Sequence, residues 1–261
     1  MKTISNLYQR PEGWECPPAE FNMSKNEIHI WKIQLDFLPQ QLKRSDHILS
    51  FQEREKAGRF FFETDKRRYL IGHSVLRTVL GKYTDTAPDQ IQFKLNPQGR
   101  PCLQNRDNSK YLDFNLSYSH STALCAIAFK RQVGVDVESV NSSLNVRSLA
   151  KQFFSDHEYK MINALPENKR PSVFLCLWTL KEACLKASGK GLGCLEEAEL
   201  PISSDVFLTQ TVNQIKTGDS GRWAIFTFMP APGCIAGLAI EGEVDFNLRF
   251  YSFRNSNGQI H

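Results

Sequence analysis

One stretch in the second half of this 261-residue chain constrains the fold most, because it predicts a single long helix with a marked start and a marked end. Apolar residues recur at helical spacing along Val173–Ser188, and Pro171 is typical of the first turn of a helix. Gly189 and Gly191 follow directly, and glycine accepts the left-handed conformation in which many helices end. We therefore expect a helix that stops at these glycines.

The charged residues of this helix lie near its end. Trp178, Glu182 and Lys186 are spaced along one ridge, whereas Lys181 points about 100° away. A Glu–Lys pair at this spacing can be an ordinary surface pair that contributes a few tenths of a kcal/mol. That interpretation leaves the following segment Gly189–Gly191 unexplained. This segment could let the backbone and Lys190 approach a ligand or a partner protein. It is not a Walker loop, because it follows a helix and lacks the required spacing.

A second informative stretch is the strand pattern Gly134–Glu138. Side chains alternate along a strand, so its valines face one way while Asp136 and Glu138 face the other, with Gly134 on the acidic side. Two like charges on one face repel each other, and a hard cation such as Mg²⁺ would relieve that repulsion. The alternative is an amphipathic strand with a solvated polar face.

Both halves of the chain follow the same order of strand, helices and strands. Ser50 and Glu53 form a capping-box pattern at the first helix, and Gly81 is expected to end the second. In the first half we predict a strand at 27–33, two helices within 49–80, and strands at 91–95, 112–116 and 123–129. In the second half we predict a strand at 133–140, helices at 153–165 and 173–188, and strands at 206–212, 223–229 and 234–240.

This order predicts an α+β fold of two similar lobes side by side. The predicted units are an irregular N-terminal arm at 1–26, an N-terminal lobe at 27–131, a C-terminal lobe with the metal site at 132–245, and a peripheral tail at 246–261.

Composition narrows the class of protein. The net charge of +4 is too small to indicate a nucleic-acid-binding protein by itself. The seven cysteines are scattered and never form a CxxC pair, which favours reduced thiols over disulfides or a zinc site. The N-terminus has no apolar leader and no segment is apolar over the length of a bilayer, so we expect a cytoplasmic protein that is not in a membrane.

Two further stretches could meet a phosphate. Phe114–Ser121 places hydroxyls and His120 at the end of a predicted strand, and Arg100 lies in the turn Gln98–Pro101. Each can equally be a plain polar turn. The basic residues around 54–77 are interleaved with acidic ones, which is typical of solvated helix faces.

Read in order, these pieces resemble the 4′-phosphopantetheinyl transferases, specifically the larger, Sfp-type branch. The resemblance covers roughly residues 45–240. It includes the basic helix pair, where Leu76 and Arg77 in the stretch Leu70–Leu80 look like the family's L-x-R although no residue separates them. Gly134–Glu138 matches the family's G-[IV]-D-[IV]-E, and Trp178–Leu192 matches W-[ST]-x-K-E-[AS]-x-x-K-x-x-G-x-G-L in full. Three more motifs are matched, two of them with one substitution: F-F-x-x-x-E-Y at Phe153–Tyr159, G-K-P at Gly99–Pro101 and F-N-[LI]-S-H-S at Phe114–Ser119.

The resemblance implies transfer of the 4′-phosphopantetheine arm of coenzyme A to a serine of an apo acyl or peptidyl carrier protein, with holo-carrier and 3′,5′-ADP as products. It implies a pseudo-dimeric fold in one chain, each lobe a small antiparallel sheet packed with helices, and a monomer that needs no nucleic acid or membrane. Mg²⁺ is the implied cofactor, with Mn²⁺ as the alternative, and coenzyme A the co-substrate. Fatty-acid, polyketide and nonribosomal peptide pathways all stay open.

The resemblance also implies roles for single residues. Asp136, Glu138 and Glu182 would hold the metal, Glu182 would take the proton from the carrier serine, and Lys186 would offset phosphate charge and protonate the departing ADP. Arg100 stands in the place of a family lysine at the nucleotide 3′-phosphate. Tyr118 stands in the place of a family histidine, and His120 is the alternative for that role. The full set of implied coenzyme A contacts is Arg54, Lys56, Arg77, Arg100, Ser117, Tyr118, Asp136, Lys181 and Lys186.

Two other classes of function are alternatives. A catalytically silent relative could bind coenzyme A or a carrier without transfer, but the complete set of three carboxylates and Lys186 argues against it. A basic, aromatic-rich RNA-binding module is disfavoured by the mixed charge at 53–68 and by the lack of a stacking motif.

Overall fold

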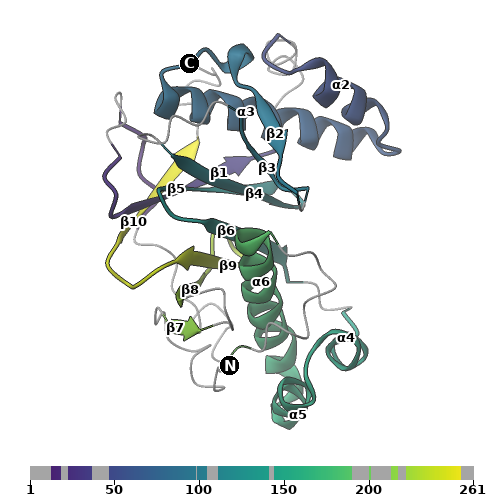
Figure 1. The fold of residues 1–261 in the computed structure, drawn as a ribbon. Helices are drawn as coiled ribbons and strands as arrows, with labels where there is room; N and C mark the ends of the chain where they lie inside the picture. Colours follow the sequence, from purple (N-terminus) through teal and green to yellow (C-terminus); the bar gives the residue numbers. More distant parts are fainter. Residues whose placement is uncertain are drawn as a thin grey trace.

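The computed structural model describes residues 13–18, 23–36, 47–97, 99–104, 111–140, 144–189, 200, 222–253 and the backbone of 213–216 (Figure 1). The predicted strand at 206–212, the motif residues Lys190–Leu192 and most of the predicted N-terminal arm lie outside these ranges. Within them, no helix is both long and apolar enough to cross a membrane.

The N-terminal lobe is built on a four-stranded sheet in the order β10-β1-β5-β4. Its strands are β1 (Glu27–Gln34), β4 (Leu112–Ser119), β5 (Thr122–Phe129) and β10 (Asn247–Phe253). Helix α3 (Glu63–Thr84) packs on one face, where Val75, Val79 and Leu80 join a buried cluster with Trp31 and Phe114. The 3₁₀ helix η2 (Pro88–Gln90) and the small hairpin of β2 (Phe93–Leu95) and β3 (Pro101–Leu103) connect α3 to β4.

Local sequence signals set the helices of this lobe. Helix α2 (Phe51–Gly58) starts at the predicted capping box, because the Ser50 and Glu53 side chains each bind the other's backbone amide. Helix α3 runs past Gly81, where its end was predicted, and stops at Thr84. The chain then doubles back so closely that the amide of Thr86 donates to the carbonyl of Gly81 at 3.0 Å, which leaves no room for a side chain at 81.

The last strand corrects the predicted peripheral tail. Asn247–Phe253 forms β10, which pairs in parallel with β1 from Glu27↔Asn247 to Ile33↔Phe253. Tyr251 on this strand is buried against Trp31 in the core of the N-terminal lobe. The chain therefore returns from the C-terminal lobe to complete the first sheet, a pairing that local sequence patterns cannot reveal.

The C-terminal lobe has a second sheet in the order β6-β9-β8-β7, and all its strand pairs are antiparallel. Its strands are β6 (Val133–Ser139), β7 (Asn213–Lys216), β8 (Arg222–Phe228) and β9 (Cys234–Glu241). The first sheet is mixed, contrary to the antiparallel sheet expected there, because β10 is parallel to β1. Helix α6 (Arg170–Ser188) packs on β6 and β9, with Pro171 in its first turn and Gly189 in the left-handed conformation at its end, as predicted.

The predicted helix at 153–165 corresponds to α5 (Asp156–Ala164), which begins three residues later than expected, and the helix before it, α4 (Val146–Phe153), was not predicted. The 3₁₀ helix η4 (Glu167–Lys169) follows α5. Ser155 separates the two helices because its side chain caps α5, and Glu158 completes a second capping box.

The two sheets share a core. The valines of β6 face β1 and β5, and this cluster includes Ile28, Leu124 and Val135. The predicted division of β6 into a valine face and an acidic face is therefore confirmed. Alongside, the side chains of β4 bind the backbone of β6: the amides of Val133, Val135 and Ser139 donate to Asp113, Asn115 and Ser119, each at 2.9 Å.

Candidate active site

Three side chains from three elements meet where the lobes join. The Lys186 ammonium on α6 donates to Asp136 Oδ1 on β6 at 2.6 Å and to Ser117 Oγ on β4 at 3.1 Å. Ser117 Oγ donates to the same Asp136 oxygen at 2.8 Å. The site is thus built by both lobes, and the structure brings together predicted residues from three of the five matched motifs.

Two glycines let α6 lie close enough for this contact. A Cβ on Gly134 would collide with the carbonyl oxygen of Ala183, and one on Gly237 with the backbone of Thr179. Because these glycines have no side chain, the backbones of β6 and β9 lie in direct contact with the backbone of α6. The space beside Gly134 is thus filled by α6, and Lys186 is placed one turn beyond Ala183.

Glu138 and Glu182 lie in the field of Asp136. Burial raises the pKa of Glu138 to about 7, with a further contribution from the Asp136 charge, and Lys186 opposes the shift. Burial, then Asp136, likewise raises the pKa of Glu182 to about 7. Three carboxyls therefore share a region with too little positive charge to keep all of them ionised at neutral pH.

The chemistry of these donors fits a hard divalent cation. Asp136 Oδ2 is buried and has no hydrogen-bond partner in the described part of the chain. Carboxylate oxygens are the ligands that Mg²⁺ prefers, and a cation would relieve the repulsion that raises both glutamate pKa values. No group of three His, Cys, Asp or Glu side chains in the described ranges is already arranged as a metal site.

Lys181 does not lie near this site, which corrects its predicted contact with coenzyme A. Its side chain is completely buried, its ammonium lies 2.7 Å from Glu158 Oε2, and it stacks over the Phe154 ring. The pair joins α6 to α5. A cation held in this way is not accessible to a phosphate.

Arg77 is also structural, contrary to its predicted role in binding coenzyme A. Its side chain is 2% exposed and its Nε lies 2.8 Å from Glu53 Oε2. Its Nη1 donates to the carbonyls of Pro88 and Ile91. Arg77 therefore ties α2 and α3 to the segment that leads into β2.

Arg100 points into the junction between the lobes. One nitrogen, Nη2, donates to Asp113 Oδ2 at 2.7 Å and to the carbonyls of Phe114 and Val133. These bonds hold Arg100 within the protein, and its contact with the nucleotide 3′-phosphate stays a prediction.

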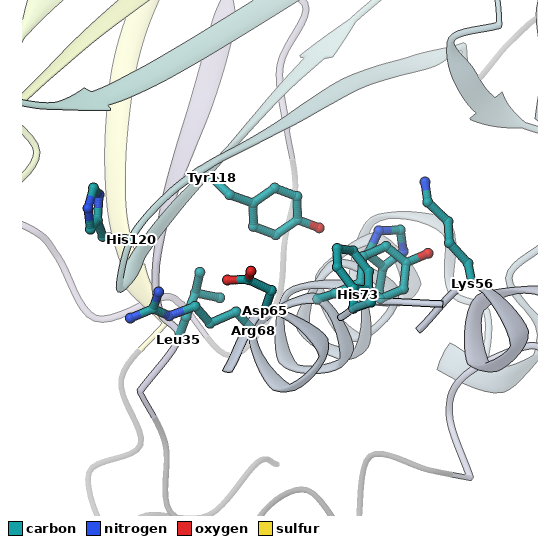
Figure 2. Close-up of a pocket in the computed structure, with 9 residues that line it drawn as sticks. Leu35, Lys56, Asp65, Arg68, His73, Tyr118 and His120 are labelled. Carbon is teal, nitrogen blue, oxygen red and sulfur yellow. The ribbon is translucent and has the colours of Figure 1, made fainter. Parts of the chain in front are cut away.

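A pocket of about 420 Å³ lies between α3 and the β4–β5 hairpin (Figure 2). Figure 2 shows Tyr118 reaching from the hairpin toward His73 on α3, and Lys56 on α2 beside them. Of the predicted coenzyme A contacts, Lys56 and Tyr118 line this pocket, and Arg54 does not. The complete lining is Leu35, Lys56, Phe60, Asp65, Arg68, Tyr69, His73, Tyr118 and His120.

Sequence reasoning missed Tyr69 and His73 as lining residues. Their ring centroids are 4.1 Å apart, and His73 Nδ1 lies 2.9 Å from Glu53 Oε1. The available signal was their spacing of one helical turn on a basic helix, which is also the signal of an ordinary helix face. His120, at the hairpin tip with φ of 50°, lines the same pocket as Tyr118.

Comparison with known proteins gives the family. The family model described as the 4′-phosphopantetheinyl transferase superfamily matches residues 132–231, and that of a 4′-phosphopantetheinyl transferase N-terminal domain matches 37–132. The chain is similar to the 4′-phosphopantetheinyl transferase HetI of Nostoc, 36% identical over 88% of this chain and 94% of the relative. It is 30% identical to Sfp of Bacillus subtilis over 63% of this chain and 72% of the relative. It is 31% identical to gsp of Aneurinibacillus migulanus over 67% of this chain and 71% of the relative. The chain therefore belongs to the 4′-phosphopantetheinyl transferase family.

Proposed function

We propose that this enzyme transfers the 4′-phosphopantetheine arm of coenzyme A to a serine of an apo acyl or peptidyl carrier protein. The serine oxygen bonds to the phosphorus that bears pantetheine, the pyrophosphate P–O bond to the nucleotide breaks, and 3′,5′-ADP leaves. The observation that carries the proposal is the meeting of Asp136, Ser117 and Lys186 beside Glu138 and Glu182, in a chain of this family.

We propose that Asp136, Glu138 and Glu182 hold Mg²⁺, or Mn²⁺ in its place. Support comes from the unpartnered Asp136 Oδ2 and from two glutamates whose pKa values are raised to about 7. A bound divalent cation supplies positive charge to the pyrophosphate as it becomes a leaving group.

The protein's own groups supply the proton transfers. In the metal-free protein the pKa of Glu182 is raised to about 7, and a bound cation would lower it. The ionised carboxylate could then accept the proton of the carrier serine, directly or through water, and we assign it that role. The ammonium of Lys186 lies beside Asp136 and can neutralise charge on the departing phosphate and return a proton to it. Glu182 and Lys186 lie one turn apart on α6, so a single rigid element carries both roles.

For coenzyme A, the aromatic pocket is the proposed site of the nucleotide end. Lys56 and Arg68 provide its cations, and Tyr118 follows Ser117 on β4, so one strand contributes to both the pocket and the carboxylate site. Arg54, a further predicted coenzyme A contact, is exposed on α2 outside this pocket. We expect the enzyme to act as a monomer in the cytoplasm, without nucleic acid or membrane.

Incubation with coenzyme A, Mg²⁺ and apo carrier proteins tests the proposal. We expect the carrier mass to increase by one phosphopantetheine arm, and a chelator to stop the reaction. A panel of acyl and peptidyl carriers also reports which class is served. If the mass stays constant for every carrier in the panel, the proposal is wrong.

A further inference from the structure

We propose that Arg100 is a positioning residue that fixes the end of α6, and thereby Lys186, against β6. In this role it does not bind a phosphate of the nucleotide. The inference rests on the proposed function, since it concerns the placement of Lys186 for that reaction.

The first step is the set of acceptors around the guanidinium. Nη2 of Arg100 lies 2.7 Å from Asp113 Oδ2, 2.9 Å from the Phe114 carbonyl and 2.7 Å from the Val133 carbonyl. Nη1 donates to the carbonyl of Ala187 at 3.4 Å. One side chain from the β2–β3 connection thus contacts β4, the start of β6 and the last turn of α6.

Asp113 holds the guanidinium in this orientation. Its side chain is 2% exposed, and its Oδ2 accepts from both Arg100 Nη2 and the amide of Val133. The Arg100 side chain is itself only 12% exposed. If the guanidinium turned outward to a phosphate, the buried Asp113 carboxylate would lose its bond to Arg100, which opposes that movement.

These bonds of Arg100, which we call the Arg100 clamp, act at the residues that set the position of Lys186. Ala187 directly follows Lys186, and Gly134, next to Val133, packs against the backbone of Ala183 and Ala187. The last carbonyls of a helix lack intrahelical donors, so a cation there also opposes the negative end of the helix dipole. Arg100 therefore bonds to the backbones of both α6 and β6, the two elements that carry Lys186 and Asp136.

Arg100→Lys separates positioning from phosphate binding. A lysine keeps the point charge that a phosphate needs, but it cannot serve acceptors on three elements with a planar fork. We expect kcat to fall about tenfold or more with saturating carrier, because small misplacements of catalytic groups have large effects on rate. KM for coenzyme A should stay within about twofold, and 3′-dephospho-coenzyme A should show the same loss of kcat.

A matched control lies at the other end of the same helix. Arg170 donates from Nε to the Leu165 carbonyl at 2.9 Å and from Nη2 to the Asn163 carbonyl at 3.1 Å. Arg170→Lys should lower thermal stability without lowering kcat at a temperature where both variants are folded. Asp113→Asn should reproduce the kcat loss of Arg100→Lys.

Hydrogen–deuterium exchange gives a readout independent of turnover. Peptides covering the last turn of α6 should exchange faster in Arg100→Lys than in the parent. In Arg170→Lys their exchange rate should equal that of the parent. Unaltered kcat and exchange in Arg100→Lys would overturn the inference. A rise in KM confined to coenzyme A and absent with 3′-dephospho-coenzyme A would also overturn it, by assigning Arg100 to the 3′-phosphate. Parent enzyme that modifies no carrier would instead contradict the proposed function, while the exchange experiment would still test the clamp.

Discussion

At the scale of single residues, the acidic site is organised for chemistry at the expense of stability. Asp136, Glu138 and Glu182 share one largely buried region. Lys186 opposes the rise in both glutamate pKa values, and a hydrogen bond with Ser119 also opposes it at Glu138. Each ionised glutamate therefore destabilises the metal-free protein at a pH above its raised pKa. Sites of this kind are expected in enzymes, where function competes with stability.

Glu182→Gln should separate the two properties. Removal of the buried charge should raise the free energy of unfolding of the metal-free protein by about 1–3 kcal/mol above neutral pH, because the folded-state pKa of about 7 exceeds the ordinary value of 4.5. Transfer to the carrier should be lost. Urea unfolding in the presence of a chelator and the carrier mass assay measure the two effects. Retained transfer would show that Glu182 is neither base nor ligand.

The same carboxyls predict how stability depends on pH. Glu138 and Glu182 have folded-state pKa values of about 7 against 4.5 when unfolded, so the folded protein binds more protons between these values. Their stabilising contribution is complete below pH 4.5 and is lost as pH rises through 7. Urea unfolding of the metal-free protein across this range should show the loss.

A Glu138→Gln/Glu182→Gln variant is the control for this pH dependence. Its stability should fall less between pH 4.5 and 7 than that of the parent, whereas an equal slope in both proteins would contradict the assignment. The comparison cancels the opposite contribution of His29, whose burial lowers its pKa to about 4. Added Mg²⁺ should stabilise the parent more at the higher pH, because metal ligands must be deprotonated.

At the scale of elements, the close approach of α6 to β6 is what assembles the site. Gly134→Ala should separate them, since the new methyl group would collide with the Ala183 carbonyl, a backbone atom that cannot move aside alone. We expect a loss of about 3 kcal/mol or more in the free energy of unfolding, together with loss of transfer. Chemical unfolding measures the first effect and the carrier mass assay the second.

Gly58→Ala is the matched control for this substitution. Gly58 lies on α2 in open space and outside the left-handed region, so alanine there should be neutral or stabilising by up to about 1 kcal/mol. Equal stability of Gly134→Ala and the parent would show that the helix and the strand are less closely packed than described.

Elements were predictable from sequence where the signal is local. The Ser50–Glu53 capping box, the glycine end of α6 and the two faces of β6 each depend on neighbours along the chain. The partners of buried cations were not predictable, because they lie on other elements. Lys181 was expected beside a phosphate, yet Glu158 on α5 neutralises it completely inside the protein. The same holds for Arg100, whose acceptors belong to three separate elements.

At the scale of the whole molecule, the two lobes are joined into one folding unit. The valine face of β6 packs against β1 and β5 in a common core, and β4 binds the backbone of β6 through its side chains. The chain then crosses back, so β10 pairs with β1 at the far edge of the first sheet. The site between the lobes therefore depends on contacts contributed by residues near both ends of the described chain.

Truncation before β10 tests this dependence. A chain that ends at Asp245 loses one of the two strands that pair with β1, along Glu27–Ile33, and keeps β5 on the other side. It also uncovers Trp31, whose ring centroid lies 5.2 Å from that of Tyr251. We expect this chain to lose cooperative thermal unfolding and to aggregate, since β1 becomes an exposed apolar edge strand. A chain that ends at Phe253 keeps every described β10 pair and should unfold at the parent temperature. If the shorter chain also unfolds cooperatively at that temperature and still modifies a carrier, β10 contributes no more than the peripheral tail first expected from sequence.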